Sequence, residues 1–208
     1  SNVPTEAGPH CLPDRLDYPC YPECGDCKAC DWTSCEDDVG FLLSITQAVK
    51  DSLLVDPDRF YLLGNSNGGS MVQRLGCDYP EHFAAVGIMI FQMPPGHACG
   101  PSEMLPMFHY YGELDDGVPP DGLPSPYGWV YTSAADNTRI WAETMGCRGP
   151  AVPWRTELTQ EHDLQCEAYT DCPGEGVAGV SCGDPTADHE GAAQRIAASP
   201  ADCVAPAQ

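Results

Sequence analysis

The chain has 208 residues, of which 42% are hydrophobic, so it is long enough to bury one sizeable core and is expected to form one main domain. Its formal net charge is −22, and Lys28 and Lys50 are its only lysines, so its surface repels phosphate backbones and anionic lipid headgroups. We therefore expect neither nucleic acid nor a membrane as a partner. The longest apolar stretch, residues 83–91, is far shorter than the roughly 20 residues that cross a bilayer, and it predicts a buried strand.

Cysteine usage indicates an oxidising compartment. Thirteen cysteines in this chain predict several disulfides, which are common in secreted and extracellular proteins and rare in the cytosol. The odd count leaves at least one thiol unpaired or bonded to another chain. No signal peptide is recognisable and the chain begins at Ser1, so we expect a mature or trimmed secreted product.

Residues 1–35 form a cysteine-rich N-terminal segment with neither strand alternation nor helical periodicity, and a loop held by disulfides is expected there. Its run Cys24-x-x-Cys27-x-x-Cys30 has a spacing that also suits zinc or an iron–sulfur cluster. We favour disulfides, because no second C-x-x-C pair closes a zinc site and the rest of the chain is also rich in cysteine.

Residues 36–200 are expected to form the core, followed by a tail at 201–208. Apolar residues at helical spacing predict a helix over 36–54, which Asp56-Pro57-Asp58 ends. Strand patterns over 59–64 and 84–91 flank a helical pattern over 67–77, which is typical of a parallel strand–helix–strand crossover.

The second half of the chain continues this alternation of strands and helices. We expect a strand over 107–111, a loop rich in proline and glycine over 117–130, a helix over 132–146, short strands over 153–159, 164–169 and 177–182, and a closing helix over 190–198. The order of elements predicts an α/β fold with a mostly parallel sheet flanked by helices.

The pentapeptide Gly64-Asn65-Ser66-Asn67-Gly68 lies between a strand pattern and a helical pattern, which is the setting of a G-x-S-x-G nucleophile elbow. This turn is tight enough to strain the serine and expose its hydroxyl, and a side chain at either glycine is expected to crowd it. Ser66 is the candidate nucleophile, and the backbone N–H of Asn67 is the candidate oxyanion donor.

A serine nucleophile needs an imidazole to take its proton and a carboxylate to orient the imidazole. In α/β-hydrolases these groups follow the serine in the order acid, then histidine, on loops after later strands. Asp115, after the strand over 107–111, is the preferred acid and Asp116 the alternative. His189, in the loop before the closing helix, is the preferred base; His162 is the alternative, although its acidic neighbours favour simple surface exposure.

Several separated motifs carry a family resemblance that spans residues 31 to about 195. They are Asp37-Asp38-Val39-Gly40-Phe41, Val55-Asp56-Pro57-Asp58-Arg59, the elbow with Gly69 and Met71, Tyr79-Pro80-Glu81-His82-Phe83-Ala84-Ala85-Val86, and Tyr111-Gly112-Glu113-Leu114-Asp115 with Val118-Pro119. In residues and order they resemble the secreted polyhydroxybutyrate depolymerases and the feruloyl or acetylxylan esterases of the α/β-hydrolase fold.

The resemblance implies that Asp115 is the triad acid, that Cys147 pairs with Cys172, and that Cys77 pairs with Cys99. The chain departs from the family in two places. Its histidine segment Ala187-Asp188-His189-Glu190-Gly191 lacks the family's run of glycines. The family's opening strands and its His-Gly oxyanion segment are missing, so we expect a truncated or minimal α/β-hydrolase fold with Asn67 as its one nameable oxyanion donor.

We therefore predict a secreted serine esterase that hydrolyses polyester, feruloyl or other aryl esters through Ser66, His189 and Asp115, without a metal or organic cofactor. Its partner is a small-molecule or polymeric ester. Aromatic residues beyond the acid either line a substrate subsite or pack the loop onto the core; they are Tyr127, Trp129 and Tyr131. The alternatives are a hydrolase-like extracellular binding module with little or no activity and a cysteine-rich metal-binding protein.

Overall fold

The computed structural model describes residues 37–52, 54–95, 98–173 and 178–198. The predictions for the cysteine-rich segment, including its Cys24-x-x-Cys27-x-x-Cys30 run, and for the tail at 201–208 lie outside the described residues.

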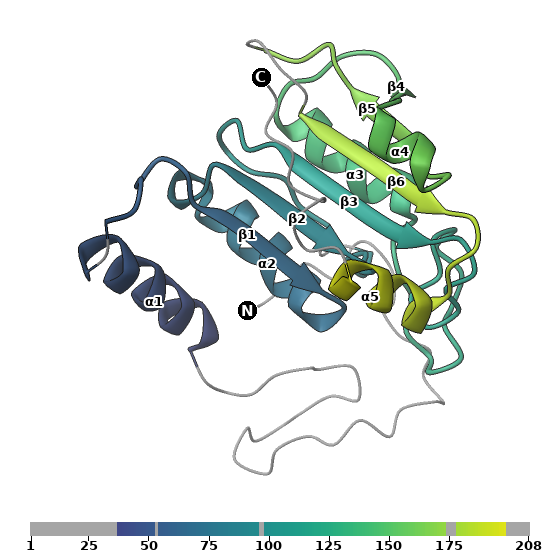
Figure 1. Cartoon of the computed structure of the whole chain (residues 1–208), viewed down its shortest axis with the longest axis horizontal. Helices are drawn as coiled ribbons and strands as arrows, with labels where there is room; N and C mark the ends of the chain where they lie inside the picture. The colour runs from purple at the N-terminus through teal and green to yellow at the C-terminus, as the bar shows by residue number, and fades with distance from the viewer. Residues whose placement is uncertain (1–36, 53, 96–97, 174–177, 199–208) are drawn as a thin grey trace.

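A mixed six-stranded sheet forms the centre of the fold, in the order β1-β2-β3-β6-β5-β4 (Figure 1). The strands are β1 (Tyr61–Asn65), β2 (Ala85–Met89), β3 (Met107–Gly112), β4 (Val152–Pro153), β5 (Gln165–Tyr169) and β6 (Gly179–Asp184). The first four strands of that order are parallel, and β5 and β4 continue the sheet in antiparallel fashion. The predicted α/β fold is confirmed, and the carboxyl ends of β1, β3 and β6 meet at one edge of the sheet.

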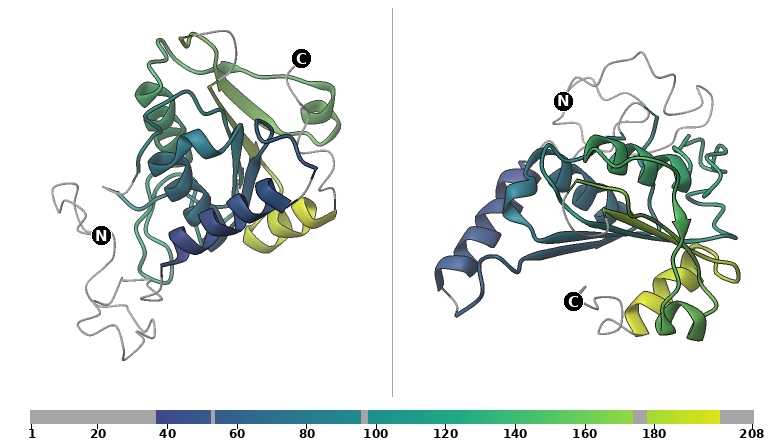
Figure 2. Two further views of the ribbon diagram at one scale, coloured as in Figure 1. Left: turned by 90° about the vertical axis from the view of Figure 1, so that its left-hand side faces the viewer. Right: turned by 90° about the horizontal axis from the view of Figure 1, so that it is seen from above.

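Helices lie on both faces of this sheet (Figure 2). One face carries α2 (Asn67–Asp78) and α3 (Ala134–Thr144), and the opposite face carries α4 (Glu157–Glu161) and α5 (His189–Ala198). A short 3-10 turn, η3 (Pro80–His82), leads from α2 to β2. The helix α1 (Asp38–Ser52) lies beyond β1, at the side of the sheet (Figure 1). No helix in the described ranges is long and apolar enough to cross a membrane.

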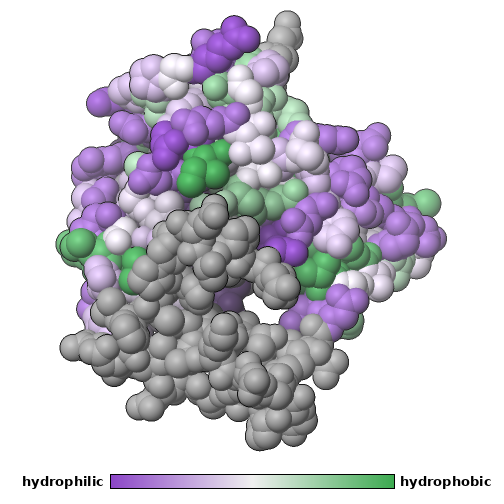
Figure 3. Space-filling model, turned by 180° about the vertical axis from the view of Figure 1, so that it is seen from behind, coloured by the Kyte–Doolittle hydropathy of each residue, from purple (hydrophilic) through white to green (hydrophobic). Residues whose placement is uncertain are grey.

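The central strand β2 shows why the sheet is a buried layer. Four of its five residues are buried, and its sequence is a nearly continuous apolar run, as expected for a parallel strand covered on both faces. Helix α3 is fixed against the sheet by Trp141, which is fully buried and donates a hydrogen bond from Nε1 to the Leu105 carbonyl at 2.9 Å. Outside this core the surface is mostly hydrophilic, as Figure 3 shows for the face seen from behind.

Disulfides reinforce the sheet and its connections. The structure contains the predicted Cys77–Cys99 and Cys147–Cys172 bonds. A third bond, Cys166–Cys182, was not predicted; it joins β5 to β6 at directly paired positions. No sequence pattern predicted this bond, because the two cysteines lie in separate strands whose register is defined only by the folded sheet.

Two expected elements differ from the structure. The strand expected over 153–159 is wrong: β4 covers only Val152–Pro153, and the helix α4 begins at Glu157. The Thr156 side chain accepts from the Thr159 amide while the Thr159 hydroxyl accepts from the Thr156 amide, a reciprocal capping box that starts a helix there. His189 also differs in place, because it is the first residue of α5 and not a loop residue before it.

Candidate active site

The chain reverses direction sharply between β1 and α2, and Ser66 is the single residue between them. Its backbone has φ 52° and ψ −121°, a strained conformation that side-chain-bearing residues rarely adopt. The turn is held by the Ser66 amide, which donates to the Met89 carbonyl of β2 at 2.9 Å. This geometry places the Ser66 side chain beyond the carboxyl end of β1, where it lines a pocket.

Glycine is required at only one of the two expected elbow positions. A Cβ atom on Gly64 would collide with the backbone carbonyl of Gly68 and with the side chain of Val72. The expectation for Gly68 is wrong, because a Cβ atom there meets nothing within 4 Å. Gly69 is the second tight position: its Cβ would lie 3.0 Å from the Cβ of Phe91. The steric requirement therefore falls on Gly64, which faces the start of α2, and on Gly69, which faces the chain at the carboxyl end of β2.

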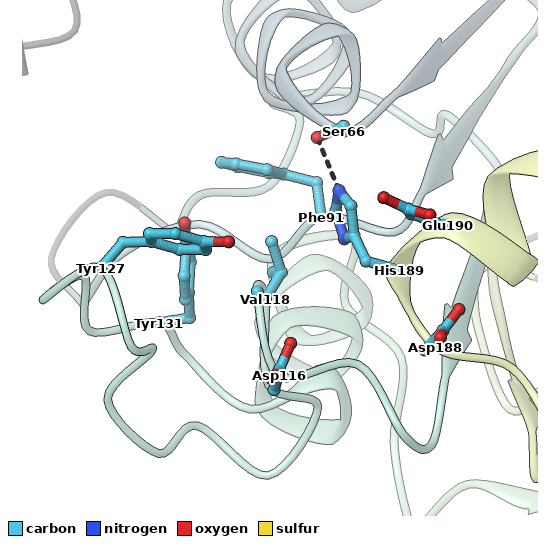
Figure 4. Close-up of a pocket in the computed structure, with 10 residues that line it drawn as sticks. Ser66, Phe91, Asp116, Val118, Tyr127, Tyr131, Asp188, His189 and Glu190 are labelled. Carbon is cyan, nitrogen blue, oxygen red and sulfur yellow. Dashed lines mark hydrogen bonds between the residues drawn. The ribbon is translucent and has the colours of Figure 1, made fainter.

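Three sequence-predicted residues form one hydrogen-bonded line at the carboxyl edge of the sheet, and Figure 4 shows its first bond, between Ser66 and His189. Ser66 Oγ lies 3.1 Å from His189 Nε2, and His189 Nδ1 lies 2.7 Å from Asp115 Oδ2. Asp115 is buried, and its other oxygen accepts the Val118 amide at 2.8 Å. The residues follow β1, β3 and β6, so the parallel strand order brings together groups separated by 123 residues in the chain.

The electrostatics of this line favour a basic imidazole. The hydrogen bond that His189 donates to Asp115 raises the pKa of His189 above its ordinary value of 6.5, although partial burial opposes the shift. The nearby carboxylates of Asp115, Asp116 and Asp188 raise this pKa further. The bond to Asp115 also favours the tautomer that carries its proton on Nδ1, which leaves Nε2 free to accept a proton from Ser66.

A second buried carboxylate, which the sequence reasoning missed, anchors the segment that carries His189. Asp184 is fully buried at the end of β6; its Oδ2 accepts from the Tyr110 hydroxyl at 2.9 Å. Its Oδ1 accepts from the amide and hydroxyl of Thr186 at 3.0 and 2.9 Å. The signal for it was an Asp that follows a strand and precedes Pro-Thr, a pattern typical of a side chain that closes a turn on its own backbone.

The alternative acid and base take other positions. Asp116 is exposed and lines the neighbouring pocket, and it has no hydrogen bond to His189 among the described contacts. His162 is exposed at the carboxyl end of α4. The geometry therefore favours Asp115 and His189 over these two alternatives.

A pocket of about 330 Å³ opens beside Ser66 and His189. Tyr127 and Tyr131 line it, whereas Trp129 does not. Trp129 is only 5% exposed and belongs to the main hydrophobic cluster, so it packs the loop onto the core. In Figure 4 the two tyrosines lie across the pocket from His189, and Val118 lies between the tyrosines and His189.

The oxyanion site is less complete than the triad. Asn67 is the first residue of α2, so its amide is one of the N–H groups that a helix leaves without an internal partner. It remains the predicted donor. A second donor is not identified among the described residues, and none of their histidine, cysteine and acidic side chains form a group that could hold a metal ion.

Comparisons with known proteins point to esterases. No protein-family model matches the chain. It is 36% identical over 87 residues to a putative esterase, NocK, of Nocardia uniformis subsp. tsuyamanensis, which covers 41% of this chain and 25% of that protein. It is 28% identical over 146 residues to feruloyl esterase B of Piromyces equi, covering 66% of this chain and 26% of that protein. The chain is distantly related to proteins named as esterases.

A solved structure supports the fold. The acetyl xylan esterase from Aspergillus awamori superposes with a TM-score of 0.50 at 14% sequence identity, over 72% of this chain and 61% of that one. The match confirms an α/β architecture. The matches to the two curated relatives span about a quarter of the length of each.

Proposed function

We propose that this protein is a serine hydrolase of carboxylic esters in which Ser66, His189 and Asp115 form the catalytic triad. The observation that carries the proposal is the unbroken line of hydrogen bonds from the strained Ser66 through His189 to the buried Asp115. The esterase names of the distant relatives agree with this chemistry.

The mechanism follows from these distances. Ser66 Oγ attacks the ester carbonyl carbon as His189 Nε2, 3.1 Å away, takes the hydroxyl proton. Asp115 stabilises the resulting imidazolium through the bond at Nδ1, and the Asn67 amide stabilises the oxyanion. His189 returns the proton to the leaving alcohol, and an acyl-serine forms. A water molecule then loses a proton to His189 and attacks the acyl carbon. His189 returns this proton to Ser66 Oγ as the acyl–oxygen bond breaks, which releases the carboxylic acid and regenerates the enzyme.

The substrate range is proposed from names and resemblance. A feruloyl esterase and an acetyl xylan esterase are among the similar proteins, and the sequence motifs resemble polyester depolymerases as well. We propose aryl, acetyl or polyester substrates, and an extracellular site of action in view of the three disulfides in the described residues.

A hydrolase-like binding module with little activity is the second candidate. It is favoured by one observation, that a second oxyanion donor is not identified in the described part of the chain. Losing one such donor typically lowers turnover by about 10²–10³. A fluorophosphonate probe separates the two candidates, because it reacts covalently with an activated serine in oxidised wild-type protein and should leave Ser66→Ala unlabelled.

Ester hydrolysis provides the direct test. On 4-nitrophenyl acetate, a feruloyl ester and a polyester film, Ser66→Ala and His189→Ala should lower kcat by about 10⁴ or more. His162→Ala, which changes an exposed histidine, is the matched control and should keep wild-type activity. Equal activity in Ser66→Ala and wild type would refute the mechanism.

The pH profile tests the base separately. His189 must be neutral to accept the serine proton, so kcat/KM should fall as the pH drops through the raised pKa, which lies above 6.5. An acid limb at or below the pKa of an ordinary histidine would contradict the proposed hydrogen bond between Asp115 and His189 in the working enzyme.

A further inference from the structure

The pocket beside Ser66 has two kinds of wall. One is aromatic and apolar, formed by Phe91, Tyr127, Tyr131 and Val118. The other carries carboxylates: Asp116 from the loop after β3, and Asp188 and Glu190 on either side of the base. Figure 4 shows the tyrosines on one side of the pocket, with Glu190 beside His189 on the other. Any ester attacked by Ser66 places its acyl or alcohol part between these walls.

Apart from the base His189, no residue that lines this pocket can offset its negative charge. None of the ten lining residues is lysine or arginine. The described ion pairs of arginine are made elsewhere, by Arg59 with Asp56, Arg74 with Asp78, and Arg139 with Asp136 and Glu143. Asp188 accepts the Gly191 amide at 2.7 Å, which caps α5 but leaves the charge of the carboxylate in place.

Aromatic rings next to uncompensated carboxylates favour one class of ligand. The face of a tyrosine ring attracts a cation within about 6 Å, most strongly when the cation is a poorly hydrated quaternary ammonium. A carboxylate several ångströms away adds a Coulomb attraction that is stronger in a partly enclosed pocket than in bulk water. The same field repels an anionic group, and it disfavours retention of the carboxylate that hydrolysis produces.

We propose that this pocket selects esters that carry a positive charge, such as a quaternary ammonium group, over neutral esters of the same shape, and rejects anionic ones. The proposal rests on the esterase function proposed above and names its substrate class. Asp116 and Glu190 supply the selectivity, and the exposed ring of Tyr127 supplies the surface on which the cation lies. Tyr131, only 6% exposed and packed edge-on against Phe91, holds the apolar wall in place.

Three thioesters of similar size test the charge preference. Acetylthiocholine carries a trimethylammonium group, 3,3-dimethylbutyl thioacetate replaces its nitrogen with carbon, and S-acetyl-3-mercaptopropionate carries a carboxylate. At low salt we expect kcat/KM to fall in that order, by about tenfold or more from the cation to its neutral counterpart. Salt at about 0.5 M should shrink this ratio and leave the neutral thioester unaffected, since ions screen only the charged substrates.

Matched variants locate the selectivity. Asp116→Asn and Glu190→Gln should each lower the cation-to-neutral ratio about threefold to fivefold. Glu103→Gln removes the same charge from an exposed residue before β3, at the opposite edge of the sheet from Ser66, and should leave the ratio unchanged. A ratio near one in the wild type, or equal ratios in all four proteins, overturns the proposal.

A binding measurement separates this proposal from the esterase proposal. In Ser66→Ala, choline should broaden or shift the NMR signals of Tyr127 and Tyr131 at concentrations where 3,3-dimethylbutanol does not. Selective choline binding by a protein that hydrolyses no ester and takes no fluorophosphonate would refute the esterase and keep the cation site. Ester hydrolysis without selective choline binding would refute the cation site alone.

Discussion

Two helices with similar sequence patterns have different surroundings in this fold. Helix α3 buries Ala134, Asn137, Thr138, Trp141 and Ala142 against the sheet. Helix α1 has apolar residues at helical spacing but no buried residue, and Phe41 and Ile45 are 64% and 45% exposed. The comparison teaches that periodicity defines an apolar face but does not guarantee a partner for it.

The strand beside α1 is similarly uncovered. Tyr61 and Leu63 of β1 are each 45% exposed, whereas the residues of β2, one strand farther in, are mostly buried. Lys50 makes the described attachments of α1, with its Nζ 3.3 Å from the His82 carbonyl and 4.7 Å from the centre of the Phe60 ring. The stability of the fold should therefore come from the part around β3, β6 and α3.

The strongest test of this contrast is Trp141→Ala. The substitution removes a fully buried indole from α3 and leaves the Leu105 carbonyl without its 2.9 Å donor. We expect the free energy of unfolding to fall by about 3–5 kcal/mol, measured by urea denaturation followed by circular dichroism. A loss below about 1 kcal/mol would mean that α3 is not part of the stabilising core.

The disulfide between β5 and β6 should have the next largest effect. Replacing Cys166 and Cys182 together by alanine opens a loop with a sequence separation of 16 residues. A disulfide that closes a loop of this size stabilises the folded state by about 3 kcal/mol, because it lowers the entropy of the unfolded chain. Thermal unfolding of the double variant, compared with wild type under non-reducing conditions, measures the loss; an unchanged midpoint would contradict it.

A pH effect on stability should also originate in this core. His109 is fully buried, and burial lowers its pKa from 6.5 to about 4, although the hydrogen bond to the Phe91 carbonyl opposes the shift. Between these values the unfolded chain binds a proton that the folded chain does not, so stability falls as the pH drops from 6.5 towards 4, by up to about 3 kcal/mol. In His109→Gln, which keeps a hydrogen-bonding side chain, this part of the pH dependence should disappear from denaturant titrations.

His189 acts on stability in the opposite sense. Its folded-state pKa is raised, so its contribution is fully present below the unfolded value of 6.5 and is lost as the pH rises through the folded value. The difference between wild type and His109→Gln isolates the contribution of His109, because both proteins retain His189.

The smallest effect is expected in α1. Phe41→Ser changes a side chain that is already 64% exposed, so the free energy of unfolding should change by less than about 0.5 kcal/mol. A loss above about 2 kcal/mol in the same urea assay would show that α1 packs against a partner in solution, and the contrast with α3 would then fail.

The sequence predicted the α/β fold and located the three residues of the proposed triad, because the elbow and the order of acid and base depend on local turns and chain order. It failed where register or reciprocal side-chain contacts decide the outcome. The Cys166–Cys182 bond depends on the pairing of β5 with β6, and the capping box at Thr156 converted an expected strand into α4. The anchoring of the base segment by Asp184 depends on Tyr110 of the neighbouring strand β3, which lies 74 residues earlier in the chain, so no local pattern shows it.

The position of His189 at the start of α5 also bears on biosynthesis. Ser66 is made early and sits in a turn that local sequence defines, yet its proton acceptor lies 123 residues later. During synthesis from the N-terminus, β6 and α5 join the sheet after every other described element. Ser66 should therefore remain unreactive on the growing chain, and the onset of ester cleavage should report that α5 has docked.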